Sequence, residues 1–156
     1  HTGPSDGQPP EDTLRRYLDR FSQHHGIPAE LTIEPPGAEL GLAADEEMQV
    51  FHFVQEAVSN AQRHADANLI RVRLETDPSR LRVEVADDGR GFDVSAVDGQ
   101  GLGLRFMHER ADELGGRVLL SSEPGQGTQV VLDLPHPPSH SASSRSDRTV
   151  ALGGAS

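Results

Sequence analysis

Three polar side chains in the middle of the chain stand at helical spacing and could bind a cation or a phosphate. Glu56, Asn60 and His64 follow one another at i, i+4 and i+8, along the border of the apolar face that an amphipathic helix would bury there. A carboxylate and an amide oxygen suit Mg²⁺, which keeps several waters and takes few protein ligands. The imidazole of His64 can donate a hydrogen bond to an anion. Polar groups at a helix border are usually only solvated, so the stripe alone is a weak signal.

A second candidate site is the sequence Asp-Asp-Gly-Arg-Gly at residues 87–91, which directly follows a predicted strand. Gly89 and Gly91 are one residue apart, so the backbone there can adopt positive φ and approach a ligand closely. The carboxylate of Asp87, partly shielded at the strand end, can accept a hydrogen bond from an amino group such as N6 of adenine. The alternative is an Asp-Gly turn between two strands.

Two further glycine-rich segments follow. Gly101, Leu102, Gly103 and Leu104 come directly before a predicted helix, where backbone amides and the helix dipole favour an anion. Their spacing is not the dinucleotide-binding fingerprint, because no strand immediately precedes them and position 104 is Leu. The later sequence Gly-Gln-Gly-Thr is by default a hairpin turn, in which Thr128 could make a polar contact at the start of a strand.

The composition excludes several classes of protein. The 156 residues carry a formal net charge of −11 and contain no Cys, and a count of the sequence finds no Lys. Without Lys there is no Walker A P-loop, no eukaryotic-type protein kinase site and no Schiff-base catalysis. Without Cys there are no disulfides, no Cys–zinc sites and no thiol nucleophiles. The acidic balance argues against nucleic acid as the main partner. No apolar run approaches the ~20 residues of a membrane span, and no signal-peptide pattern is visible, so we expect a soluble domain.

The chain divides into one domain with polar ends. Residues 1–10 are rich in Gly and Pro and are predicted to be a linker, and residues 136–156 have the composition of a flexible tail. Residues 11–135 carry the whole net charge of −11 and are predicted to form the domain.

The predicted elements of this domain come in a mixed order. Apolar residues at helical spacing predict three helices, and alternating patterns predict about five strands. Asp45 is predicted to be the N-cap of the second helix, and Gly115-Gly116 to end the third. The helices are expected from Leu14 to near Gly26, at 45–65 and at 104–114, and the strands at 30–34, 70–75, 81–86, 118–122 and 129–134. This order predicts an α/β (α+β) two-layer sandwich, with helices on one face of a mixed, mostly antiparallel sheet.

Taken together, the four segments resemble the ATP-binding catalytic domain of bacterial two-component sensor histidine kinases, in the GHKL (Bergerat-fold) superfamily. The resemblance covers about residues 11–135. Residues 56–64 resemble the N box, 87–91 the G1 box, 101–104 the G2 box and 125–128 the closing G-x-G-T of that family.

A finer resemblance concerns the helix after the G2 box. Residues 103–116, which include Glu109-Arg110-Ala111 and end in Gly115-Gly116, are similar to the subfamily whose partners are LuxR-type response regulators. The short segment between the G1 and G2 boxes, residues 93–98, agrees with this subfamily.

The resemblance implies a role for each motif residue. Asn60 would ligate Mg²⁺, Glu56 would act on the water shell of the metal or as a polarising carboxylate, and these two would be the catalytic residues. His64 would approach the phosphates. Asp87 would accept from adenine N6, and Thr128 would support it through a water. The remaining members of the ATP site would be Gly89 and Gly91, which leave room for the base, and Gly101, Leu102, Gly103 and Leu104, whose amides hold the phosphates. Residues 93–100 would form a mobile lid over ATP.

The implied function is to bind Mg-ATP and to donate its γ-phosphoryl group to a histidine on a separate helical dimerisation domain of the same kinase. A LuxR-type response regulator would be the indirect partner. The alternatives are an anti-sigma-factor-type serine kinase of the same superfamily and a non-catalytic module that senses ATP or ADP.

The sequence departs from a complete kinase in two ways. It shows no phosphoacceptor hairpin: His108-Glu109 copies the acceptor's His-acid pair but lies inside the helix after the G2 box, and His24-His25 ends the first helix. We therefore expect a monomeric, cytoplasmic domain, whether or not the full protein is anchored in a membrane. In addition, Asp88 stands where many members of the family have Asn, a tolerable change that puts the family's hydrogen bonding of that loop in question.

Overall fold

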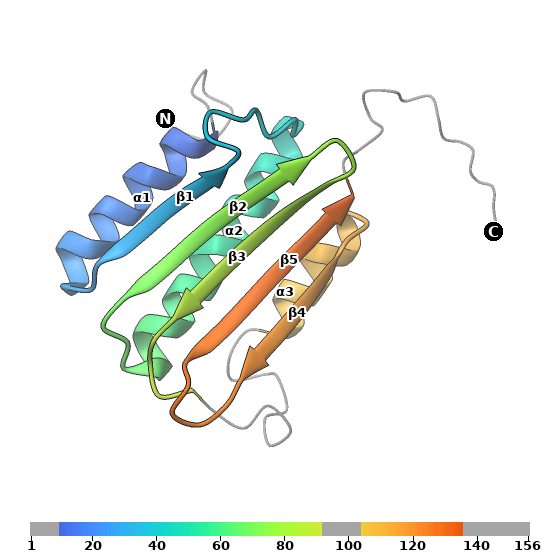
Figure 1. The fold of residues 1–156 in the computed structure, drawn as a ribbon. Helices are drawn as coiled ribbons and strands as arrows, with labels where there is room; N and C mark the ends of the chain where they lie inside the picture. Colours follow the sequence, from blue (N-terminus) through green and yellow to red (C-terminus); the bar gives the residue numbers. More distant parts are fainter. Residues whose placement is uncertain (1–9, 92–103, 136–156) are drawn as a thin grey trace.

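The structure is a computed structural model that describes residues 10–91 and 104–135, without the side chains of residues 64–65 and 104–106. The predicted linker before residue 10, the predicted lid, residues 101–103 and the predicted tail lie outside the described residues (Figure 1).

Three helices, one π-helical turn and five strands make up the described part of the chain. The helices are α1 (Pro10–His25), α2 (Ala44–Asn60) and α3 (Leu104–Glu113), and the π-helical turn η1 (Ala61–Ala65) continues α2. The strands are β1 (Ala29–Glu34), β2 (Ile70–Asp77), β3 (Arg80–Asp87), β4 (Arg117–Ser122) and β5 (Thr128–Pro135).

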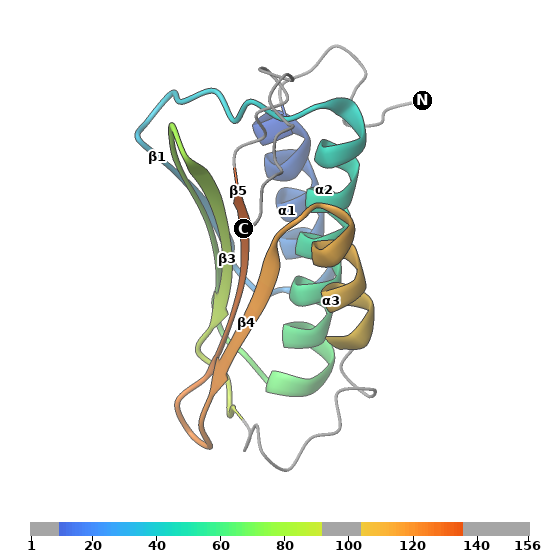
Figure 2. The same ribbon diagram turned by 90° about the vertical axis from the view of Figure 1, so that its right-hand side faces the viewer.

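The strands form one mixed sheet in the order β1-β2-β3-β5-β4. β1 and β2 are parallel, and every other neighbouring pair is antiparallel. The parallel pair needs a crossover, which α2 supplies. All three helices cover the same face of the sheet (Figure 2). The predicted two-layer architecture is confirmed.

The core lies between the two layers. Apolar residues at helical spacing on the helices meet the inward-facing positions of the strands, which alternate with outward-facing polar residues. Its fully buried side chains are Phe53, Leu18, Ile70, Leu74, Leu81, Met107, Leu132, Val54, Val58, Val72 and Val83. This packing fixes α2 against β3, and so sets the distance between the two elements that carry the first two predicted motifs.

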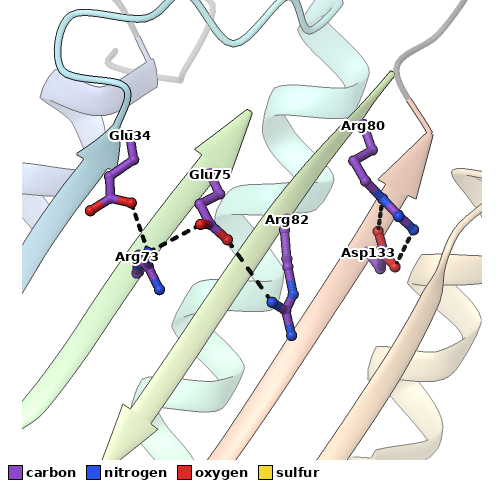
Figure 3. A network of polar contacts seen from close by, with 6 residues as sticks. All are labelled: Glu34, Arg73, Glu75, Arg80, Arg82 and Asp133. Carbon is purple, nitrogen blue, oxygen red and sulfur yellow. Dashed lines mark hydrogen bonds and ion pairs between the residues drawn. The ribbon is translucent and has the colours of Figure 1, made fainter. Parts of the chain in front are cut away.

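The open face of the sheet is polar, and its charges pair across strands (Figure 3). Arg73 Nη2 lies 2.7 Å from Glu34 Oε1 and 3.0 Å from Glu75 Oε2. Arg80 donates two hydrogen bonds, of 3.0 and 2.7 Å, to the carboxylate of Asp133, which is only 8% exposed. The charges shown on the open face are therefore partly neutralised by pairing with one another.

Two helix starts differ from the sequence-based prediction. α2 begins at Ala44 with Ala43 as its N-cap, so the prediction of Asp45 was wrong. The carboxylate of Glu46 accepts a 2.7 Å hydrogen bond from the amide of Ala43, which satisfies the cap without a polar side chain at that position. α1 begins at Pro10, inside the predicted linker, because proline has no N–H to lose at a first helical position.

Candidate functional site

The last turn of α2 brings Glu56 and Asn60 together, as the spacing predicts. A third residue joins them: Nη2 of Arg63, from η1, donates a 3.1 Å hydrogen bond to Oδ1 of Asn60 and lies 3.7 Å from Oε2 of Glu56. The side chain of Glu56 is 26% exposed. The two oxygens therefore lie close enough to contact one cationic group.

The π-helical turn η1 follows this pair and was not predicted. It runs from Ala61 to Ala65, and Asp66 ends it in the left-handed conformation with φ 56°. The helix therefore extends to the predicted end near Ala65, but its last turn is wider than an α-helix, a feature that often occurs at functional sites. His64 belongs to η1, and its side chain lies outside the described residues.

At the end of β3, Asp87 is half-buried and held by two backbone amides. Its Oδ1 accepts a 2.8 Å hydrogen bond from the amide of Gly89, and the amide of Thr128 also donates to the carboxylate. Burial raises the pKa of Asp87 above its usual range, although the two amide hydrogen bonds act in the opposite direction. The carboxylate is thus fixed in place, and its two hydrogen bonds do not fully offset the cost of burying its charge. A further hydrogen-bond donor would therefore stabilise the charged form.

The neighbouring Asp88 links the two motifs, which the sequence did not indicate. Its Oδ1 accepts hydrogen bonds of 2.8 and 3.0 Å from the amides of Asn68 and Leu69, in the loop between η1 and β2. These hydrogen bonds hold the pKa of Asp88 below its usual range. Asp is thus tolerated at this position, because its carboxylate ties the loop after η1 to the end of β3.

We expect this link to make stability depend on pH. The folded state lowers the pKa of Asp88, so its ionised form stabilises the fold above the ordinary pKa of Asp, and this contribution is lost as pH falls through the lowered value. Asp88→Asn keeps an acceptor oxygen but no charge. In an Asp87→Asn background, which removes the neighbouring titration, urea unfolding should show Asp88→Asn to be less stable at pH 7. The difference should shrink below pH ~4, and a difference independent of pH would contradict the assignment.

The turn between β4 and β5 packs against the loop after β3. A Cβ built on Gly91, at φ +63°, would lie 2.1 Å from the carbonyl oxygen of Glu123, and one on Gly127, at φ +80°, would lie 2.1 Å from that of Asp87. Gly91 is therefore required by contact with protein backbone, whereas room for a base at Gly89 stays a prediction. Thr128 lies opposite Asp87 in the β3–β5 register, with its Oγ1 2.9 Å from Oγ of Ser122.

Gly127→Ala should be strongly destabilising. The left-handed backbone alone costs an Ala about 1 kcal/mol, and the contact with the carbonyl of Asp87 adds to it, so we expect a total loss of about 3 kcal/mol in the free energy of unfolding. Gly125→Ala is the matched control, because Gly125 has φ +81° in the same turn but nothing within 4 Å of its Cβ position. Chemical denaturation of both variants measures the difference, and equal losses would show that the contact does not matter.

The other predicted residues lie apart or outside the description. Gly101, Leu102 and Gly103 are not described, and Leu104 is the first residue of α3. His108 and Glu109 are exposed on α3. His24 and His25 end α1 and line a cavity of about 630 Å³ together with Tyr17, Ser59 and Gln62 among others. None of the predicted site residues lines this cavity, so it is separate from the site.

Within the described ranges no three His, Asp or Glu side chains gather at one point. A metal at Glu56 and Asn60 would therefore depend on few protein ligands, which is how Mg²⁺ is commonly held next to phosphates. No helix in the described parts of the chain combines the length and the apolar character needed to cross a membrane.

Comparison with known families shows which family the chain belongs to. The family model described as histidine kinase-, DNA gyrase B- and HSP90-like ATPase matches residues 45–138, from the start of α2 to just beyond β5. The chain belongs to this ATPase family. The match includes α2, the end of β3 and the β4–β5 turn, where the described motif residues lie.

Relatives of this ATPase domain include sensor histidine kinases. The chain is 33% identical over 145 residues to the sensor histidine kinase LiaS of Bacillus subtilis (strain 168), a match over 93% of this chain but 39% of LiaS. The ATP-binding domain of PrrB from Mycobacterium tuberculosis shares the fold with a TM-score of 0.65 at 24% identity, over 81% of this chain and 93% of that domain. Full-length ShkA, solved in complex with AMPPNP, matches with a TM-score of 0.67 at 26% identity, over 80% of this chain and 29% of ShkA.

Proposed function

We propose that this ATPase domain binds Mg-ATP and donates its γ-phosphoryl group to a histidine on a separate helical dimerisation domain of the same kinase. The observation that carries the proposal is the pairing of a fixed, half-buried carboxylate at the end of β3 with an oxygen pair at the end of α2. The carboxylate would accept a hydrogen bond from the adenine base, and the oxygen pair would bind the metal on the phosphates. The similarity to LiaS supports phosphoryl transfer to a histidine as the reaction, because that relative is a sensor histidine kinase.

Asp87 would recognise the adenine base. Its carboxylate would accept from N6 of the base, and Thr128, which lies opposite in the sheet register, would support it through a water. Gly89, whose amide already donates to Asp87, would leave room beside the ring. The structure of ShkA with AMPPNP supports an adenine nucleotide as the ligand.

Glu56 and Asn60 would form the metal side of the site. Asn60 would ligate Mg²⁺, and Glu56 would act on the water shell of the metal; the oxygens of both now contact Arg63. Mg²⁺ supplies charge neutralisation between the phosphates, which lets the domain act without a lysine. His64 and the backbone of Gly101, Leu102, Gly103 and Leu104 would contact the phosphates, as the resemblance to histidine kinases implies.

The partners belong to the same proposal. The chain spans 39% of LiaS, so the phosphoacceptor histidine would lie in a helical domain elsewhere in the full-length protein. The sequence of α3 and the two glycines after it favours a LuxR-type response regulator as the downstream acceptor. We further propose that the domain itself is monomeric and works in the cytoplasm.

Phosphoryl transfer tests the proposal. The domain is mixed with the helical hairpin domain of its full-length protein and γ-labelled ATP in the presence of Mg²⁺. We expect label on the hairpin that is lost in acid and kept in base, as for phosphohistidine. Acid-stable phosphoserine would support the serine-kinase alternative, and nucleotide binding without transfer would support a sensing module. Either result would overturn the histidine kinase proposal.

A further inference from the structure

α2 and α3 are joined by a polar cluster that the proposed site does not use. Nε2 of Gln49, on α2, donates a 3.1 Å hydrogen bond to Oε1 of Glu113, on α3. Nη1 of Arg110, also on α3, donates to Oε1 of the same Gln49. Both ends of one amide are therefore bound to the neighbouring helix. We call these three residues the α2–α3 clamp.

The clamp lies on the same stripe of α2 as the proposed metal ligands. Gln49, Glu56 and Asn60 stand at i, i+7 and i+11, which places them within about 40° of one another around an α-helix. The clamp occupies the N-terminal part of this stripe, and the oxygen pair of Glu56 and Asn60 occupies the C-terminal part. One face of one rigid helix thus carries both.

Apolar packing holds α3 against α2, and the polar contacts add directional interactions to it. Met107 and Ala111 are fully buried, at 0 and 1% exposure, and such contacts are non-directional. A charge-assisted hydrogen bond is directional, and the two that meet at Gln49 are satisfied at one position only. Burial and the charge of Arg110 lower the pKa of His52, which lies one turn after Gln49. The clamp is therefore the polar determinant of this helix pair.

The position of the clamp determines where α3 begins relative to the site. α3 runs beside α2 in the opposite direction (Figure 2). Six residues separate Arg110 from Leu104, which is about 9 Å of helix, and seven separate Gln49 from Glu56, which is about 10.5 Å. The first residue of α3 therefore lies level with Glu56.

We propose that Gln49 and Arg110 are positioning residues, which fix the start of α3 against Glu56 and Asn60 and so shape the phosphate half of the site without touching the nucleotide. The inference rests on the proposed function, because it assigns the clamp to ATP binding. Asp87, at the end of β3, does not belong to this helix pair. The clamp should consequently affect the phosphates and leave the base unaffected.

Gln49→Leu removes both hydrogen bonds at nearly constant volume and is the variant that tests the clamp. Calorimetric titration in Mg²⁺ should show the Kd for ATP raised about tenfold, as expected for a displacement of less than 1 Å, with the Kd for adenosine unchanged. A purely structural role would weaken both ligands in proportion to lost folding. Equal effects on both ligands, or none on ATP, would overturn the inference.

Two controls separate the clamp from general damage. Glu113→Gln keeps an acceptor for Gln49 and should bind ATP like the unaltered domain. Arg110→Leu should weaken ATP binding as Gln49→Leu does, and the double variant should be no worse than either single one, because the two residues act as a unit. Additive losses would contradict this. If the unaltered domain bound adenosine but not ATP, or neither, the proposed function would fail rather than the clamp alone.

Discussion

Asp87→Asn should abolish most of the affinity for ATP, with Kd raised about 100-fold or more, since a hydrogen bond to a charged acceptor contributes ~3 kcal/mol. In the native domain the amide of Gly89 donates to Oδ1 of Asp87. An Asn at this position must keep its oxygen there, which turns its NH₂ group toward the ligand. Two donors, that group and adenine N6, would then face each other. Titration with Mg-ATP measures the loss.

The same substitution should not destabilise the empty domain. Burial raises the pKa of Asp87, so ionising it costs the folded state free energy at neutral pH. A neutral Asn avoids that cost and can still accept from the amide of Gly89. Thermal unfolding should therefore give Asp87→Asn a Tm equal to or above that of the unaltered domain, without the rise that ATP causes in the latter. A variant that binds ATP normally would move the adenine site elsewhere.

Affinity for ATP in the unaltered domain should also fall in acid. The raised pKa of Asp87 means that its carboxyl takes up a proton at a higher pH than an ordinary Asp, and the protonated form no longer accepts fully from N6. The loss should be absent from Asp87→Asn, which has no proton to gain at this position. The Kd for Mg-ATP is measured at pH 7 and near pH 5 for both proteins, and the change in Kd between the two pH values is compared.

Asn60→Ala is expected to remove the benefit of Mg²⁺. The variant loses the amide oxygen that faces Glu56 across Arg63, so its Kd for ATP in Mg²⁺ should rise to the value measured in EDTA. Phosphoryl transfer should fall about 100-fold or more, because the metal neutralises charge on the transferred group. Binding in EDTA should be almost unchanged.

Gln62→Ala is the matched control for Asn60→Ala. Gln62 also carries an amide and lies two residues away, but it lines the cavity beside α1. It should bind and react like the unaltered domain. An equal loss of affinity with and without metal in Asn60→Ala would contradict the metal role of Asn60. If Gln62→Ala lost as much affinity as Asn60→Ala, the loss in both variants would come from damage to the last turn of the helix.

The sequence predicted the fold well because the signals were local and strong. Alternation along Ile70, Val72 and Leu74 indicated the strand and its buried face, and the pattern through Val50, Val54 and Val58 did the same for α2. The order of the strands in the sheet was not predicted, since alternation alone does not pair distant strands. The start of α2 was misplaced because the carboxylate that caps it stands three residues inside the helix.

The site was predicted less completely, since side chains from different elements meet there. Glu56 and Asn60 share a helix, so spacing alone brought them together. Arg63 joins them through a π-helical turn that no local pattern announces. Asp88 binds amides 19 and 20 residues away, and Gln49 meets its partners on α3 across 61 and 64 residues. Contacts over such separations depend on the packed fold.

The place where Mg-ATP binds is the central claim, and amide spectra by nuclear magnetic resonance test it most directly. As Mg-ATP is added to the ¹⁵N-labelled domain, we expect saturable shifts of the backbone amides of Gly89 and Thr128 and of the side-chain amide of Asn60. The side-chain amides of Gln23, on α1, and of Gln62, in the cavity next to it, should stay constant. Shifts confined to Gln23 and Gln62, or no saturable shift, would contradict the site.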